Sequence, residues 1–320
     1  MKFRILRVAM IATLVAAASA GSAQLGGLGG LGDKLKKKVP SVDSVLQGRP
    51  PITTSLEDAR WGDASKDGFT PREATRSLMT LQRTPNGGFV LQAGYYALQV
   101  QSYCLKAGTH GPGGGDGYLY APPKGPAEDA VMTIVRNSVN RPEIAQSQIQ
   151  QLLWAIIARA KFEDLSPQLR ATAAQLLTPR QIAGLNRNAL DMVPGPVMDR
   201  AMASVPGPVR QVLQAEAQLR QMLTNPGASF AQMERIAVLS GNAPLGEGSR
   251  AVPSGRWSLH PDNYYVRYLP SGYSSTRVEI WVPQGSPAVG KEFDPAAHIA
   301  VPGNTSRQRL IQSGRAQQGA

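Results

Sequence analysis

The amino-acid sequence predicts an α+β fold in which a mainly helical domain precedes a small antiparallel β module. Between residues 127 and 240, apolar residues recur at helical spacing, and several of these stretches follow a helix-capping residue. From Arg250 onward, aromatic and β-branched residues dominate, and a turn-like segment separates two such runs. The chain has 320 residues, of which 42% are hydrophobic, so it is long enough to bury cores of this kind.

The N-terminus has the three-part pattern of a secretory signal peptide. Three basic residues lie within the first seven positions, an apolar run extends from Val8 to Ala18, and the small residues ASAGSA follow. We predict cleavage after Ala20 or Ala23, with residues 1–23 as the signal peptide. The run is shorter than the ~20 residues that span a bilayer, and no second long run follows, so we expect no transmembrane span in the mature chain. The protein should be exported to the periplasm or the cell surface.

The net charge of the chain limits the classes of partner that it is expected to bind. The formal net charge is +12, and loss of the three basic residues of the signal peptide leaves +9. An exported protein with this charge is attracted to an anionic envelope surface or an acidic polysaccharide, and a protein partner is a further candidate. We expect no nucleic acid, because export argues against it and no basic helix is interleaved with aromatic residues.

Residues 24–64 are predicted to form a flexible linker rich in glycine and lysine. Tandem LGG units disfavour a helix, since each Gly costs a helix about 1 kcal/mol. The sequence DKLKKKVPSVDSVL at 33–46 leaves an alternative open, a short basic amphipathic segment at a membrane surface.

The helical domain is predicted to span residues 65–245. A Thr70 cap followed by Pro71 indicates its first helix, and the apolar stretch Ala93–Cys104 is interpreted as helical. VPGPV occurs twice and indicates two helix starts. The remaining helices are expected at Ala127–Val139, at Pro142–Ala160, after Ser166, after Thr178, after the VPGPV copies at 193–197 and 205–209, and within 229–241.

The β module is predicted to span residues 250–302. YYVRYL and TRVEIWV are separated by PSGYSS, which is typical of a β-hairpin with a longer loop. The polar residues 303–320 are predicted to form a disordered tail.

The chain contains one cysteine, Cys104, beside the glycine-rich sequence GTHGPGGGDG. A lone cysteine cannot form an internal disulfide, so it is buried, paired with another chain, or chemically used. The glycine-rich sequence lacks the lysine and the strand–loop–helix context of a phosphate site, and we interpret it as a turn. His110, His260 and His298 have no metal-ligand spacing, so no metal or cofactor is predicted. One of them paired with Cys104 would make a cysteine hydrolase, although no hydrolase signature surrounds the cysteine.

Two short motifs resemble the thioester domains of bacterial surface adhesins. Those domains carry an aromatic-Cys-apolar stretch, matched here by 103–105, and a TQxAIW-type helix further along the chain. Gln150 lies four residues before Trp154, as in that helix, whereas Ile149 stands where the family has Thr and Leu152 where it has Ala. The resemblance covers roughly 50 residues.

The resemblance implies a thioester between Cys104 and Gln150, shielded from water by Tyr103 and Trp154. Helical spacing of about 100° per residue puts Gln150 on the apolar side of its helix, where its amide needs a partner. The alternative is that the Gln150 amide bonds a backbone group while Cys104 packs as a small hydrophobe.

The sequence therefore predicts an exported cell-envelope protein with a binding or structural role and no evident turnover chemistry. The first alternative is a thioester-bearing surface protein that couples covalently to amines through Cys104 and Gln150. A cysteine hydrolase is the second alternative.

Overall fold

The computed structural model describes residues 50–53, 55–60, 62, 64–190, 202–203 and 205–317. The predicted signal peptide, most of the predicted linker and the first VPGPV copy lie outside the described residues.

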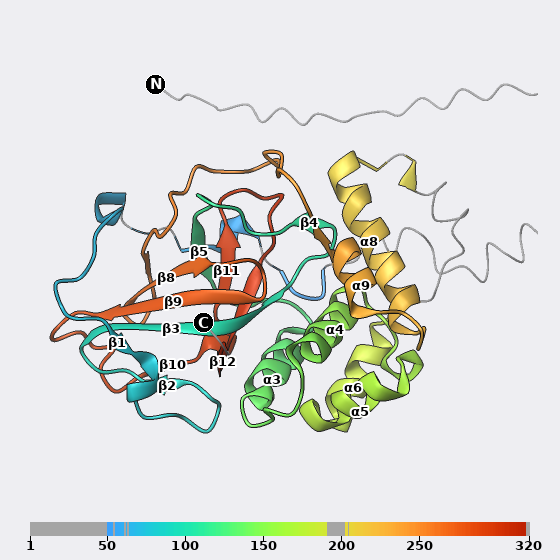
Figure 1. Ribbon diagram of the computed structural model, residues 1–320, viewed down its shortest axis with the longest axis horizontal. Coiled ribbons are helices and arrows are strands. Elements are labelled where there is room, and N and C mark those ends of the chain that lie inside the picture. The colour runs from blue at the N-terminus through green and yellow to red at the C-terminus, as the bar shows by residue number, and fades with distance from the viewer. Residues whose placement is uncertain are drawn as a thin grey trace, which may run out of the picture. The chain divides into compact units, whose positions relative to one another are not determined.

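An eight-stranded sheet forms the centre of the described structure (Figure 1). Its order is β5 (Tyr118–Ala121), β11 (Ile299–Pro302), β12 (Leu310–Ala316), β3 (Gly94–Cys104), β9 (Ser275–Val282), β8 (Tyr265–Pro270) and β7 (Ser258–Leu259), and β1 (Arg76–Ser77) pairs with β3. Every neighbouring pair is antiparallel except β1 with β3. Two small sheets pair β2 (Phe89–Val90) with β10 (Glu292–Phe293) and β4 (Thr109–His110) with β6 (Val238–Leu239).

The two ends of the large sheet approach each other. The backbone N–H of Tyr120 in β5 donates to the Ser258 hydroxyl in β7 at 3.1 Å. The Tyr120 ring also contacts the His260 ring, with centroids 4.8 Å apart. The sheet therefore nearly closes on itself and encloses side chains of its inner face.

Six α-helices of the described chain lie together on one side of the sheet (Figure 1). They are α3 (Glu128–Ser138), α4 (Gln146–Ile157), α5 (Pro167–Leu176), α6 (Pro179–Arg187), α8 (Gly207–Leu223) and α9 (Phe230–Ala237). Short 3-10 helices occur at Leu56–Asp58, Ala64–Lys66, Leu78–Thr80, Phe162–Asp164 and Pro295–Ala297. No helix among the described residues is long and apolar enough to cross a membrane.

Two hydrophobic cores flank strand β3. One joins the helices to the outer face of the sheet and contains Tyr103 together with most buried side chains of α3 and α4. The other fills the inner face and contains Cys104 and Tyr118. Successive side chains of a strand point to opposite faces, so the neighbours Tyr103 and Cys104 enter different cores.

The predicted architecture, a mainly helical domain followed by a small β module, is wrong. Strands β3 and β5 precede the helices in sequence, yet they pair with β9, β11 and β12, which follow them. The helices are thus inserted between strands of one large sheet. The sequence concealed this arrangement because two of its strands do not alternate apolar and polar residues.

Strand β3 is the first of these, and its interpretation as a helix over Ala93–Cys104 was wrong. Most of its side chains are buried because both faces are covered, so the apolar run has neither the period of a helix nor that of a half-exposed strand. The helix predicted after Thr70 is also absent from residues 70–80, where β1 precedes a short 3-10 helix.

Strand β12 is the second, and the predicted disordered tail was wrong for residues 303–317. The strand lies between β11 and β3 and is buried over most of its length. Its polar side chains make hydrogen bonds inside the protein: Ser313 donates to the Gln101 carbonyl at 3.0 Å, and Gln312 donates to the Leu310 carbonyl at 3.0 Å, although the Gln312 amide oxygen has no partner among the described residues. Polar residues with such internal hydrogen bonds can occupy a core that hydrophobicity alone does not indicate.

The other element predictions are confirmed where the structure describes them. Ser166, Thr178 and Ser229 each accept a backbone hydrogen bond as the N-cap of α5, α6 and α9. Helix α8 begins at the second VPGPV copy, and helix α4 is shorter than predicted. The predicted hairpin is formed by β8 and β9.

Candidate functional site

The structure brings the two predicted thioester residues together. Cys104 is the last residue of β3, and Gln150 lies in the second turn of α4, which packs against that strand. The Gln150 carboxamide accepts from the backbone N–H of Cys104 at 2.8 Å and donates to the backbone carbonyl of Cys104 at 3.2 Å. Both residues are buried, with exposures of 0% for Cys104 and 2% for Gln150. The buried amide is thereby satisfied on both of its polar atoms.

The Cys104 thiol is protected from solvent. Its side chain belongs to the inner core of the sheet, whereas the Gln150 amide reaches the backbone of the same residue. Burial, together with the nearby carboxylate of Glu234, raises the pKa of the thiol well above its usual range. The sulfur is therefore protonated at neutral pH and is a weak nucleophile toward solvent reagents.

A pocket of about 290 Å³ lies beside Gln150. Residues from β3, α4, α9 and the β8–β9 turn line it: Ser102, Tyr103, Gln146, Ser147, Gln150, Phe230, Glu234, Tyr273 and Ser274. Four elements that are distant in sequence thus meet at one amide. The pocket gives a small molecule or a side chain a route to the Gln150 carboxamide.

The polar groups of this pocket are bonded to each other. The Tyr273 hydroxyl donates to the Glu234 carboxylate, and the Gln146 amide donates to the Ser274 carbonyl at 2.6 Å and to the Ser102 carbonyl at 3.2 Å. Burial and the hydrogen bond to Glu234 raise the pKa of Tyr273. Glu234 is the carboxylate whose charge is felt by both Tyr273 and the Cys104 thiol.

The two predicted shielding residues occupy different positions. Tyr103 lines the pocket, is fully buried, and donates from its hydroxyl to Gln101 at 3.0 Å. Trp154 lies in the helix-facing core and stacks on Phe230 with centroids 5.4 Å apart. Phe230, rather than Trp154, therefore forms the aromatic wall of the pocket, and Trp154 supports it from behind.

Sequence reasoning missed Glu234 and Tyr273. It placed Glu234 on the last helix and Tyr273 in the hairpin loop without a functional role. An aromatic residue inside a polar turn was the one available signal, because such a residue needs something to pack against. The link between α9 and the hairpin is a long-range contact that no local pattern reveals.

The glycine-rich loop contains the turn that the sequence predicts, at residues 114–115. The Asp116 carboxylate accepts from the Gly113 N–H at 2.7 Å and pairs with Arg307 at 2.9 Å. Arg307 also donates to the Gly111 carbonyl at 2.7 Å. Two side chains thus hold the loop closed.

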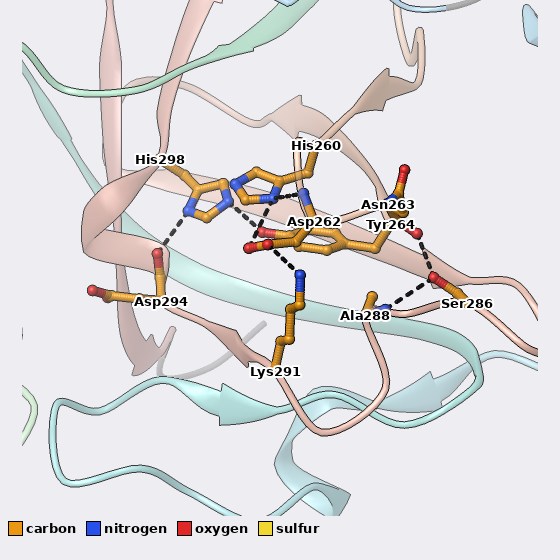
Figure 2. A network of polar contacts seen from close by, with 9 residues as sticks. All are labelled: His260, Asp262, Asn263, Tyr264, Ser286, Ala288, Lys291, Asp294 and His298. Atoms are coloured by element: carbon orange, nitrogen blue, oxygen red, sulfur yellow. Dashed lines mark hydrogen bonds and ion pairs between the residues drawn. The ribbon is translucent and has the colours of Figure 1, made fainter.

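Two of the three histidines form a stack near the seam where β5 approaches β7, next to Tyr120, and Figure 2 shows them with their polar partners. The rings of His260 and His298 have centroids 5.0 Å apart and planes 24° apart. His260 accepts from the backbone N–H of Asp262 at 3.1 Å, and the Asp262 carboxylate pairs with Lys291 at 2.6 Å. His298 lies 2.7 Å from both the Asp294 main-chain oxygen and the Tyr264 hydroxyl.

These contacts fix the proton positions. A carbonyl oxygen only accepts, so Nδ1 of His298 carries the proton and its Nε2 accepts from Tyr264. Burial lowers the pKa of His260 to about 4 and that of His298 to about 3, so both rings are neutral at pH 7. None of the three histidines is hydrogen-bonded to Cys104 among the residues that the structure describes, so the hydrolase alternative has no assembled pair of nucleophile and base there.

No known protein family, curated protein or solved structure matches this chain. Any assignment of function must therefore come from the geometry of the sites.

Proposed function

We propose that this protein is an exported coupler that forms a thioester between Cys104 and Gln150 and then transfers the Gln150 acyl group to an amine. The observation that carries the proposal is the pair of hydrogen bonds that hold the Gln150 carboxamide on Cys104, across a sequence separation of 46 residues. The burial of both residues supports it, because a thioester survives only where water is excluded.

The first step is intramolecular. The Cys104 side chain belongs to the inner core, whereas α4 packs on the other face of β3, so the end of the strand must first rearrange to bring the sulfur to the Gln150 amide. The sulfur then attacks the Gln150 carbonyl carbon, a C–S bond forms, the C–N bond breaks, and the amide nitrogen leaves as ammonia with the thiol proton. Once the two groups are held together, proximity offsets the weak nucleophilicity of the protonated thiol.

The second step uses an external amine that enters the pocket beside Gln150. The amine nitrogen attacks the thioester carbonyl, an amide bond to Gln150 forms, and the C–S bond breaks to release the Cys104 thiol. The Glu234 carboxylate, which lines the same pocket, is placed to accept the proton that the amine loses. Each molecule reacts once, so the protein is consumed and does not turn over.

Intact mass spectrometry of the folded, untreated protein tests the first step. Loss of ammonia makes the chain about 17 Da lighter than its sequence requires. Methylamine should then add to Gln150 and expose the Cys104 thiol to a maleimide reagent. Cys104→Ala should abolish both the mass loss and the addition, whereas Gln151→Glu, a change at a neighbouring position of the same helix, should leave both intact. A full-length mass together with no methylamine adduct would contradict the proposal.

A second candidate follows from the same contacts. The Gln150 amide is satisfied on both polar atoms by backbone groups, and this favours a structural pair in an envelope protein that binds its partner without covalent chemistry. This candidate predicts the full mass, no methylamine adduct, and maleimide labelling only after unfolding.

A further inference from the structure

A large groove lies away from Cys104. It has a volume of about 1020 Å³, which is the size of a pocket for a small organic ligand. Five segments form it: residues 55–57, residues 106–110 after β3, the start of α8, the loop 244–250, and residues 305–309 before β12. Gly108 makes the close approach to α8 feasible, because its φ is +66° and a Cβ there would lie 2.9 Å from the Gln211 carbonyl oxygen.

One wall of the groove carries positive charge. Lys106, Arg250 and Arg309 line it, whereas its two acidic residues, Glu57 and Glu247, are exposed at the rim. The Lys106 side chain makes no hydrogen bond or ion pair with the residues that the structure describes. Burial, with Arg309 as a second cause, lowers the pKa of Lys106 to about 8. Partial burial of an ammonium group without a partner lowers the stability of the fold, and an anionic ligand that binds the group would offset this loss.

Two further donors face the same space. Thr109 lines the groove with only 5% exposure, and its hydroxyl has no hydrogen-bond partner among the described residues. The first turn of α8, from Pro206 to Val209, also lines the groove, and the N-terminal end of a helix attracts anions. The unpartnered buried hydroxyl and the helix end are independent indications of an acceptor-rich ligand.

Another part of the groove lining is apolar. It includes Leu56, Pro206, Pro208 and Val212, and Val209 is 51% exposed. Leu245, between lining residues 244 and 246, is 85% exposed. Apolar side chains exposed beside a concave surface are typical of a site that covers them with ligand.

We propose that this groove binds an organic anion that joins a charged head, such as a carboxylate or a phosphate, to an apolar body. The head lies against Lys106 and Thr109, and the body lies along the apolar side chains of the lining. The site does not depend on the proposed thioester, because none of its lining residues lines the pocket beside Gln150.

Isothermal titration calorimetry of the full chain tests the proposal with octyl phosphate, octanoate, octanol and inorganic phosphate. Octyl phosphate or octanoate should bind at least about tenfold more tightly than octanol and inorganic phosphate, which corresponds to about 1.4 kcal/mol. Lys106→Met should lower the affinity of the better anion about tenfold and leave octanol unchanged. Thr109→Val, which keeps the shape of the side chain, should lower it about threefold.

Two controls separate the outcomes. Lys291→Met removes the same charge from a lysine outside the groove and should bind like the wild type. Cys104→Ala should also bind like the wild type, so a failed thioester leaves this test intact. Equal affinity for inorganic phosphate or for octanol would overturn the proposal, as would no binding of any probe or unchanged affinity in both Lys106→Met and Thr109→Val.

Discussion

The pocket beside Gln150 and the cationic groove differ in how their polar groups are satisfied. In the pocket, the amides of Gln146 and Gln150 and the Glu234 carboxylate are bonded to other groups of the protein. In the groove, the Thr109 hydroxyl has no hydrogen-bond partner among the described residues, and the Lys106 ammonium makes no hydrogen bond or close ion pair there, although the charge of Glu216 attracts it. A closed set of hydrogen bonds stabilises the fold and favours chemistry between its own members, whereas donors without partners weaken the fold and favour a ligand.

The largest expected effect on stability is at the pocket wall. Trp154→Ala should lower the free energy of unfolding by about 3–5 kcal/mol, because it opens a cavity beneath Phe230. Val209→Ala, at the edge of the groove, should change it by less than about 0.5 kcal/mol, since Val209 is half exposed. Urea unfolding followed by circular dichroism measures the free energy of unfolding of both variants. Similar losses in the two variants would contradict the difference proposed here between the pocket and the groove.

Gln150→Leu should have the next largest effect. The change leaves the backbone N–H and carbonyl of Cys104 buried without partners, and it should lower the free energy of unfolding by about 2–4 kcal/mol. Gln151→Leu is the matched control, because Gln151 bonds only to Ser147 in its own helix and should lose less than about 0.5 kcal/mol. A neutral Gln150→Leu would mean that the amide contributes nothing to the junction of α4 and β3.

The stacked rings of His260 and His298 should make the stability of the fold depend on pH, and they belong to neither the pocket beside Gln150 nor the groove. Folding lowers the pKa of His260 to about 4 and that of His298 to about 3 from an ordinary value of 6.5. Below pH 6.5 the unfolded state therefore binds more protons than the folded state, and these two groups make stability fall as the pH drops from about 6.5 toward 4. Glu216, whose pKa burial raises to about 7, acts in the opposite direction over part of this range.

Proton NMR isolates the histidine contribution. The ring signals of His260 and His298 should stay at their neutral positions from pH 8 to pH 5 in the folded protein. In urea, the same signals should titrate near pH 6.5. Titration of either ring near pH 6.5 in the folded state would show that the stack is open to solvent.

The smallest expected effect is at the groove. Lys106→Met should leave the free energy of unfolding unchanged or raise it slightly, because it removes a half-buried charge that has no ion-pair partner in the described structure. Thermal unfolding at pH 7 measures this effect. A loss of more than about 1 kcal/mol in the free energy of unfolding would mean that Lys106 stabilises the fold. Such a result would count against a ligand site in the groove.

The sequence predicted those helices and strands that are defined by contacts between residues close together in the chain. The caps Ser166, Thr178 and Ser229 mark helices because each satisfies an exposed N–H within three residues. Strand β3 is covered on both faces and does not alternate apolar and polar residues, and the buried Ser313 of β12 bonds to Gln101, which lies 212 positions away. A buried polar side chain of this kind finds its hydrogen-bond partner through tertiary contacts, and a local sequence pattern does not show these contacts.

The residues of the candidate site also fall into those that the sequence indicated and those that it did not. The resemblance to thioester domains, carried by the residues around Cys104 and by Gln150 and Trp154, suggested that the amide and the cysteine meet. The partners Glu234 and Tyr273 come from α9 and the β8–β9 turn, and only tertiary contacts bring them to the pocket. The groove combines five segments, and no local pattern in any one of them indicates it.

The position of β12 has a consequence for synthesis of the chain. Residues 310–316 fill the place between β3 and β11, so the middle of the sheet stays vacant until they have been synthesised, long after β3 at residues 94–104. Contacts between such distant segments slow folding, because a long loop must close before they form. The growing chain therefore cannot complete its sheet when β3 and the helices emerge, and the arrival of β12 decides when the sheet can close.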